Sequence, residues 1–127
     1  MVLVDTSIWI RFIANKKPYA AELDALLERG EVVGHDLIFG ELLAGDSGGR
    51  AALLSAYEMM HQAAPVPHPE VVAFVRHRKL FGRGAGWIDL HLLASTLVER
   101  GLLWTADARL RKLAEELRVQ YSPADLH

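Results

Sequence analysis

The fold is decided by a stretch at the start of the chain, Val2-Leu3-Val4-Asp5-Thr6-Ser7-Ile8-Trp9. Its first three residues are apolar without alternation, which is typical of a short strand buried on both faces. Thr6 and Ser7 then offer side-chain oxygens that can cap a helix. Because strands buried on both faces belong to parallel sheets covered by helices, this opening predicts an α/β domain.

The same alternation of short strands and helices continues along the chain. Val32-Val33 and Leu102-Leu103-Trp104 predict two further strands, and residues 119–121 predict an extended segment. Helical spacing of apolar residues predicts helices from Tyr19 to Gly30, Asp36 to Gly45, Ser47 to Met60, Pro69 to Lys79, Ile88 to Gly101 and Thr105 to Leu117. We therefore expect a three-layer α/β fold with a small, mostly parallel sheet flanked by helices.

Length and composition exclude several classes of protein. The 127 residues and 14.1 kDa leave room for one domain, residues 1–127. With 14 basic and 16 acidic residues the net charge is −2, so a polyanion must be held by a local patch or a metal ion. The absence of cysteine excludes disulfides and thiolate sites. Apolar runs too short for a membrane helix, and a start without the order of a secretory signal, predict a cytoplasmic protein.

Four carboxylates are placed where a metal site is expected. Asp5 and Asp107 follow predicted strands, and ligands of open parallel sheets bind beyond the carboxyl ends of the strands. Glu41 and Asp89 stand among apolar residues, where a carboxylate is costly to bury unless a cation compensates. Each also has a purely structural explanation. Asp5, Asp89 and Asp107 can be caps or first-turn acids, and Glu41 can point outward beside Gly40.

Taken in order, the segments that contain these acids form a recognisable set. They are Asp5-Thr6-Ser7-Ile8-Trp9-Ile10, Gly40-Glu41-Leu42-Leu43-Ala44-Gly45, the helix that carries Asp89, and Thr105-Ala106-Asp107-Ala108-Arg109-Leu110. Together they resemble the PIN-domain ribonucleases, and most closely the VapC toxins of bacterial and archaeal toxin–antitoxin pairs. The resemblance covers essentially the whole chain.

The resemblance implies a catalytic and metal-binding cluster of Asp5, Glu41, Asp89 and Asp107. It also implies that Thr6, Ser7 and Thr105 support the cluster by hydrogen bonds. Some relatives carry a further acid near the third position, where this chain has Leu90, Leu92 and Leu93. The number of metal ions, one or two, therefore stays open.

Oxygen ligands of this kind favour Mg²⁺ or Mn²⁺, which lower the pKa of a water and offset charge on a phosphate. The resemblance accordingly implies a metal-dependent endoribonuclease whose products carry a 5′-phosphate and a 3′-hydroxyl. It further implies an RNA substrate, a cognate antitoxin protein and a homodimer. For the apolar side chains of Trp9, Phe12 and Ile13 it suggests a docking face, with core packing as the alternative.

Basic residues cluster just before the Asp89 helix, namely Arg76, Arg78, Lys79 and Arg83. One interpretation is a clamp for RNA phosphates. The other is a solvated helix end, where cations suit the negative end of the helix dipole. The run Gly82-x-Gly84-x-Gly86 lacks the preceding strand and the spacing of a nucleotide-binding loop, so we interpret it as a flexible connector.

Two other functions remain as alternatives. A phosphoacceptor receiver domain shares the α/β layout and an acidic edge, but it presents paired acids after its first strand and a lysine after its last. In this chain Asp5 stands alone, and Lys112 falls inside a predicted helix. A PIN-like domain that binds RNA without cutting it is the second alternative, and the complete set of four acids argues against it.

Overall fold

The computed structural model describes residues 1–123, in which three short strands are surrounded by helices. In chain order the elements are β1 (Val2–Val4), α1 (Thr6–Ile13), α2 (Tyr19–Glu28), β2 (Val32–Val33), α3 (Asp36–Ala44), α4 (Ala51–Met59), α5 (His68–Arg78), α6 (Trp87–Glu99), β3 (Leu102–Trp104) and α7 (Ala108–Glu116). None of the helices in this part of the chain has the length and apolar character needed to cross a membrane.

The sheet has the order β2-β1-β3 and is parallel throughout. Val2 pairs with residues of both neighbouring strands, and β1 is buried along its whole length. Single parallel bridges extend the sheet at both edges, from Gly34 to Gln62 and from Leu103 to Gln120. The last of these lies in the predicted extended segment 119–121. The expected small parallel sheet is therefore confirmed.

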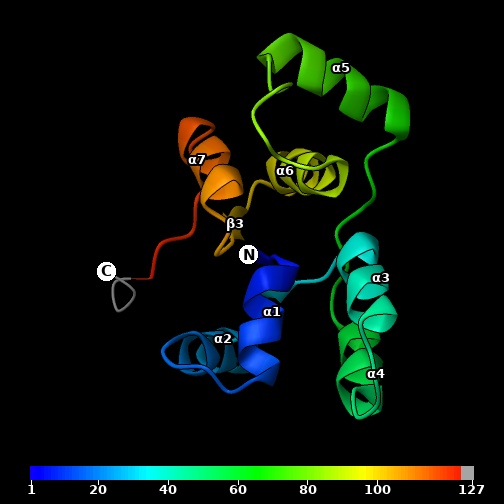
Figure 1. The fold of residues 1–127 in the computed structure, drawn as a ribbon, viewed down its shortest axis with the longest axis vertical. Coiled ribbons are helices and arrows are strands. Elements are labelled where there is room, and N and C mark those ends of the chain that lie inside the picture. The colour runs from blue at the N-terminus through cyan, green and yellow to red at the C-terminus, as the bar shows by residue number, and fades with distance from the viewer. Residues whose placement is uncertain (124–127) are drawn as a thin grey trace.

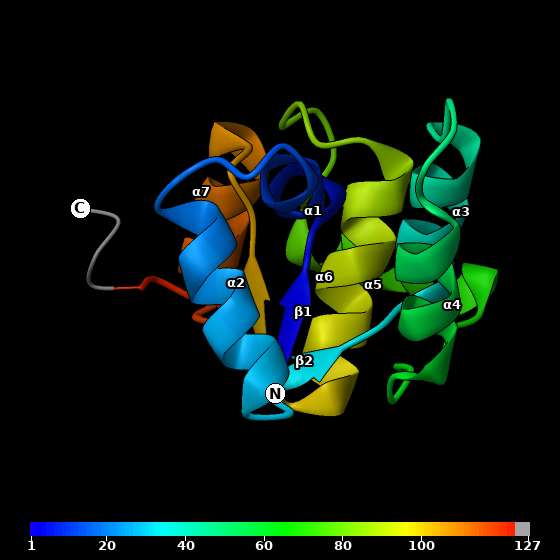
Figure 2. The same cartoon turned by 90° about the horizontal axis from the view of Figure 1, so that it is seen from below.

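Helices cover the sheet in layers. Figure 1 shows α1 and α2 on one face and α6 on the other, with α5 outside α6. The pair α3 and α4 stands on one side, and α7 lies on the β3 side. Figure 2 shows β1 and β3 running in the same direction, toward the edge where α1 begins. The three-layer α/β fold follows from these positions.

Trp9 belongs to the core rather than to a docking face. Its side chain is 1% exposed and meets the rings of Phe12 and Tyr57 edge to face, with centroids 5.7 and 5.4 Å apart. Phe12 is half-buried against the same core, whereas Ile13 is 39% exposed. For Trp9 the core alternative therefore holds, and the surface left on α1 is smaller than the sequence suggested.

Several predicted helix starts differ from the structure by one to four residues, and the last helix begins at Ala108 rather than at Thr105. Thr6 already lies inside α1, and Asp5 is the residue that precedes it. Before α3 the cap is His35 and not Asp36, because the His35 ring accepts a hydrogen bond from the next helical turn. Ser47 caps nothing, since Gly48 and Gly49 follow with φ angles of +121° and +94°. Such angles are outside the helical region, so α4 begins only at Ala51.

His35 is the centre of a buried polar network that the sequence did not reveal. It is 2% exposed and follows β2. Its Nδ1 accepts the Leu37 N–H at 3.0 Å and carries no proton, so Nε2 donates to Ser95 Oγ at 2.9 Å. The His35 N–H donates to the Tyr57 hydroxyl at 2.8 Å. The imidazole of His35 thus connects α3 and α6, and its main-chain N–H adds α4.

Burial lowers the pKa of His35, with Asp36 acting in the opposite direction and His91 in the same one. The unfolded chain consequently binds more protons than the folded one below about pH 6.5. We expect the free energy of unfolding to fall as pH drops from about 6.5 through the lowered pKa, by at most about 1.4 kcal/mol per pH unit.

Urea denaturation at a series of pH values tests this expectation with His35→Asn, whose amide can still cap α3. The variant should be less sensitive to pH than the parent protein. His61→Asn, at a histidine whose side chain is 66% exposed, should keep the parent's slope. Equal slopes in the parent and in His35→Asn would contradict the assignment.

Candidate active site

The four predicted carboxylates gather around the carboxyl ends of β1 and β3. Asp5 follows β1 directly, and Asp107 stands between β3 and α7. Glu41 lies in α3, and Asp89 lies in the first turn of α6. Figure 1 looks onto this edge of the sheet, with α1, α3, α6 and α7 around it. Parallel pairing of the strands therefore brings together acids that lie far apart in sequence.

Asp5 is the most buried of the four, at 6% exposed. Its Oδ2 accepts hydrogen bonds from Ser7 Oγ and from Thr105 Oγ1, both at 2.8 Å. Ser7 Oγ in turn accepts the Ala106 N–H at 3.0 Å, and Thr105 Oγ1 accepts the Asp107 N–H at 3.0 Å. Two hydroxyl groups thus hold the first turn of α1 against the segment after β3. Both belong to residues that the resemblance implied as supporting ones.

Glu41 and Asp89 are each held by a single hydrogen bond. Thr6 Oγ1 donates to Glu41 Oε1 at 2.6 Å, which links α1 to α3. Asp89 Oδ2 accepts the Gly86 N–H at 3.1 Å and so caps the start of α6. Thr6 therefore makes the supporting contact expected of it, and it does so with Glu41 and not with Asp5.

Asp107 caps a helix, as its structural explanation predicted, and it still has one oxygen that could bind a metal ion. Its Oδ1 accepts the N–H groups of Arg109 and Leu110 at 2.9 and 3.0 Å, so the residue caps α7. Its Oδ2 accepts nothing from residues 1–123. The same division holds for Asp5, Glu41 and Asp89: one oxygen is fixed by hydrogen bonds, and the other accepts none within this range.

The charges of the four groups interact. Burial raises the pKa of the Asp89 carboxyl, and the negative charges of Asp5, Asp107 and Glu41 raise it further, against the hydrogen bond from Gly86. Asp89 therefore lies within electrostatic reach of all three other acids.

The cluster is open rather than closed around a cation. Within residues 1–123, no three His, Asp or Glu side chains are arranged closely enough to hold a metal ion as they stand. Mg²⁺ seldom needs such a cage, because it is bound through one or two carboxylates and keeps several waters. All four side chains offer carboxylate oxygens, and one oxygen of each accepts no hydrogen bond within residues 1–123. Such a set of donors fits Mg²⁺ or Mn²⁺.

The predicted basic cluster divides in two. Arg76, Arg78 and Lys79 are exposed at the end of α5 and form no ion pair within the described part of the chain. Arg83 instead forms an ion pair with Glu116 of α7, so part of its charge is already offset. The cations at the end of α5 are therefore better placed than Arg83 to contact an RNA phosphate.

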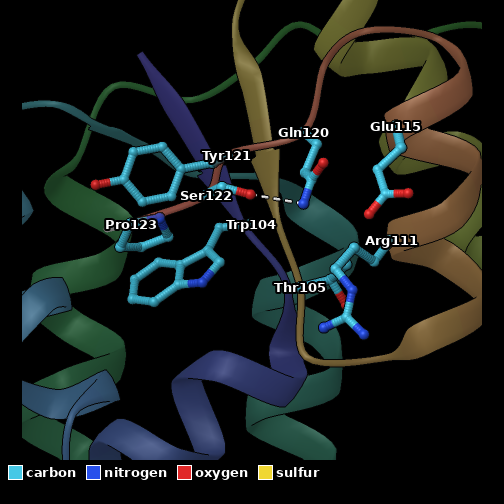
Figure 3. A pocket seen from close by; sticks show the side chains of 8 residues that line it. All are labelled: Trp104, Thr105, Arg111, Glu115, Gln120, Tyr121, Ser122 and Pro123. Atoms are coloured by element: carbon cyan, nitrogen blue, oxygen red, sulfur yellow. Dashed lines mark hydrogen bonds between the residues drawn. The ribbon is translucent and has the colours of Figure 1, made fainter. Parts of the chain in front are cut away.

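Sequence reasoning missed a polar cavity of about 200 Å³ behind Thr105, drawn in Figure 3. Thr105 and Arg111 lie on its wall near α7, and Tyr121 lies across from them. The cavity forms because the segment after α7 returns beside β3, where the Tyr121 N–H donates to the Leu103 carbonyl at 2.9 Å. No local sequence pattern marks such a return, so no signal could have located it.

Comparison with known proteins agrees with these features. The family model of the PIN domain matches residues 2–116. Two curated relatives are 38% identical over 120 residues, which covers 94% of this chain and 94% of each relative. Both are named Ribonuclease VapC32, from Mycobacterium tuberculosis strains CDC 1551 / Oshkosh and ATCC 25618 / H37Rv. The chain belongs to the PIN-domain family and, within it, to the VapC type.

Proposed function

We propose that this protein is a Mg²⁺- or Mn²⁺-dependent endoribonuclease that acts in the cytoplasm as the toxin of a type II toxin–antitoxin pair. One observation carries the proposal: four carboxylates lie around one edge of the sheet, and in each of them one oxygen is held by hydrogen bonds while the other accepts none from residues 1–123. The name of the Ribonuclease VapC32 relatives supports RNA as the substrate.

Asp5 and Asp107 are the first candidates to hold the metal ion, with Asp89 and Glu41 completing the set. When bound, the ion would lower the pKa of the attacking water, orient it and offset charge developing on the phosphate. Ser7 and Thr105 keep the Asp5 carboxylate in one orientation, because both donate to the same oxygen. Hydroxyl groups in this position raise the precision of the site without adding charge to it.

The electrostatics of Asp89 favour a cation. Its pKa is raised by burial and by the three neighbouring acids, so its charged form is unfavourable until a cation compensates it. The Gly86 N–H holds its Oδ2 and leaves Oδ1 for that cation. Positive ends of α1, α6 and α7 stand beside Asp5, Asp89 and Asp107, which favours binding of a phosphate at the same edge.

A homodimer and a cognate antitoxin belong to the same proposal. The VapC name of the relatives supports the antitoxin. On α1, Ile10 and Ile13 are 49% and 39% exposed and offer apolar surface to a partner. An uncompensated group of carboxylates also suits a basic side chain of an antitoxin, which would occupy the place of the cation.

Asp5→Asn should abolish cleavage while the protein stays folded. The amide oxygen can still accept from Ser7 and Thr105, but it lacks the charge needed to hold a cation. A digest of total RNA supplemented with Mn²⁺, followed by mapping of the 5′ and 3′ ends, measures the effect. Full activity of the variant would count against the site. A parent protein that binds RNA but leaves it uncut would favour the non-cleaving alternative.

Thr105→Val should lower the rate of cleavage roughly 10- to 100-fold, because loss of a supporting hydrogen bond misplaces a metal ligand. Thr96→Val is the matched control. Thr96 is equally buried, but its hydroxyl donates to the Leu92 carbonyl of its own helix. Rates of the two variants and the parent are compared on the same RNA. Equal rates for all three would show that Thr105 has no positioning role.

Asp89→Asn should raise the melting temperature of the metal-free protein and reduce the stabilisation that Mn²⁺ provides. In EDTA the variant should melt at a higher temperature than the parent, because the raised pKa shows that the charged carboxyl is unfavourable there, and the amide can still accept from Gly86. With Mn²⁺ at about 100 times its Kd the parent should gain about 2.7 kcal/mol, and the variant should gain less.

Asp24→Asn, at an exposed acid of α2, controls for the change in net charge and should gain as much from Mn²⁺ as the parent. Thermal melts with and without Mn²⁺ decide the question without any activity assay. An equal gain in the parent and in Asp89→Asn would remove Asp89 from the metal site.

A further inference from the structure

An apolar pocket lies between α5 and the start of α6. It has a volume of about 390 Å³ and is lined by Val72, Val75, Arg76, Phe81 and Trp87. Phe81 is 61% exposed, and Trp87 is 41% exposed. Two aromatic side chains that face solvent around one pocket indicate a binding surface, since large apolar groups are usually exposed there for a reason.

One residue of the pocket lies in the same helical turn as an acid of the carboxylate cluster. Trp87 is the first residue of α6, and Asp89 is the third. Packing holds the indole in place: its centroid is 5.3 Å from the ring of His68 and 5.0 Å from that of His91, which stands perpendicular to it. Figure 1 shows the α5–α6 connection leading to the start of α6.

Positive charge borders the pocket. Arg76 is part of its wall, and Arg78 and Lys79 follow at the exposed end of α5. In a protein of net charge −2 these unpaired cations are a local feature and not part of a basic surface. Aromatic rings beside cations fit a ligand that joins a flat apolar group to an anion, as a nucleotide does.

We propose that this pocket binds an unpaired base of the RNA substrate, stacked on Trp87 and Phe81, while Arg76 offsets the adjoining phosphate. The proposal rests on the proposed ribonuclease function and deepens it. A base inside a double helix presents no free face, so the pocket selects a single-stranded segment or loop. Trp87 shares the first turn of α6 with Asp89, and a base bound there would therefore influence which phosphodiester bond is cut.

Binding is measured in the Asp5→Asn background, so that the RNA stays intact. The probes are fluorescein-labelled 12-residue oligo(A) and oligo(U), and an abasic ribose-phosphate 12-mer of the same charge. Fluorescence anisotropy should show tighter binding of a base-bearing probe than of the abasic probe, by roughly 5- to 100-fold. Trp87→Ala and Phe81→Ala should each reduce that preference, whereas Trp87→Phe should keep most of it.

Val98→Ala is the matched control, because Val98 is an apolar residue of α6 that is 61% exposed and lies outside the pocket. It should bind every probe like the parent. Arg76→Ala should weaken binding of base-bearing and abasic probes alike and reduce the slope of log affinity against log salt by about 1.

Two results would overturn the proposal. One is an unchanged preference for base-bearing RNA in both Trp87→Ala and Phe81→Ala. The other is a loss of dimer in these variants by sedimentation without any change in RNA affinity, which would make the face an interface between copies of this chain. Cleavage of total RNA by the parent is measured in parallel. If the parent cuts RNA and the pocket variants bind normally, only the base pocket fails; if the parent never cuts RNA, the ribonuclease function fails.

Discussion

A hydrogen bond between residues 100 positions apart, from Thr105 Oγ1 to Asp5 Oδ2, is the contact on which the site depends. It forms because β1 pairs in parallel with β3, so that the segments after both strands leave the sheet side by side. Asp5 is nearly buried, and a carboxylate in that position is costly unless it is hydrogen-bonded. Thr105 and Ser7 supply those bonds from the two elements that the pairing brings together. The pairing of β1 with β3 therefore determines both the burial of Asp5 and the geometry of the site.

The strands were predictable because their signals are local, whereas the four acids were singled out only as a set, through the family resemblance. Three consecutive apolar residues before Asp5, and three before Thr105, are enough to mark strands whose ends carry the site. Helix starts were less predictable, because a cap depends on which side chain reaches the free N–H groups. His35 and Asp36 both have suitable atoms, and only the buried position between Tyr57 and Ser95 places the His35 ring on Leu37. The cavity behind Thr105 and the pocket at Trp87 depend on tertiary neighbours and leave no local pattern.

Structural and functional explanations of the acids do not exclude one another in this fold. Asp107 precedes α7 and caps its first turn with one oxygen, whereas Asp89 lies inside α6 and accepts the N–H of Gly86 before it. These hydrogen bonds use only one carboxylate oxygen of each residue, and they fix the direction in which the second oxygen points. The helix N-termini that these residues cap also bring partial positive charge to the edge, which partly offsets the repulsion among the carboxylates. Burial, together with what remains of that repulsion, raises the pKa of Asp89.

In such a protein the groups that bind RNA must differ from the carboxylates that serve cleavage. The carboxylates repel a polyanion, and the net charge of −2 provides no general attraction, so phosphate binding must come from cations beside the cluster. Arg76, Arg78 and Lys79 stand at the end of α5, while Arg83 is engaged by Glu116. Charge alone cannot choose a sequence, because every phosphate is the same. A shaped apolar surface can, and the exposed aromatic side chains of Phe81 and Trp87 lie in the sequence between the cations at the end of α5 and Asp89. Selectivity among RNA segments then follows from which base can leave its stack and reach Trp87, rather than from the carboxylates that the fold positions for cleavage.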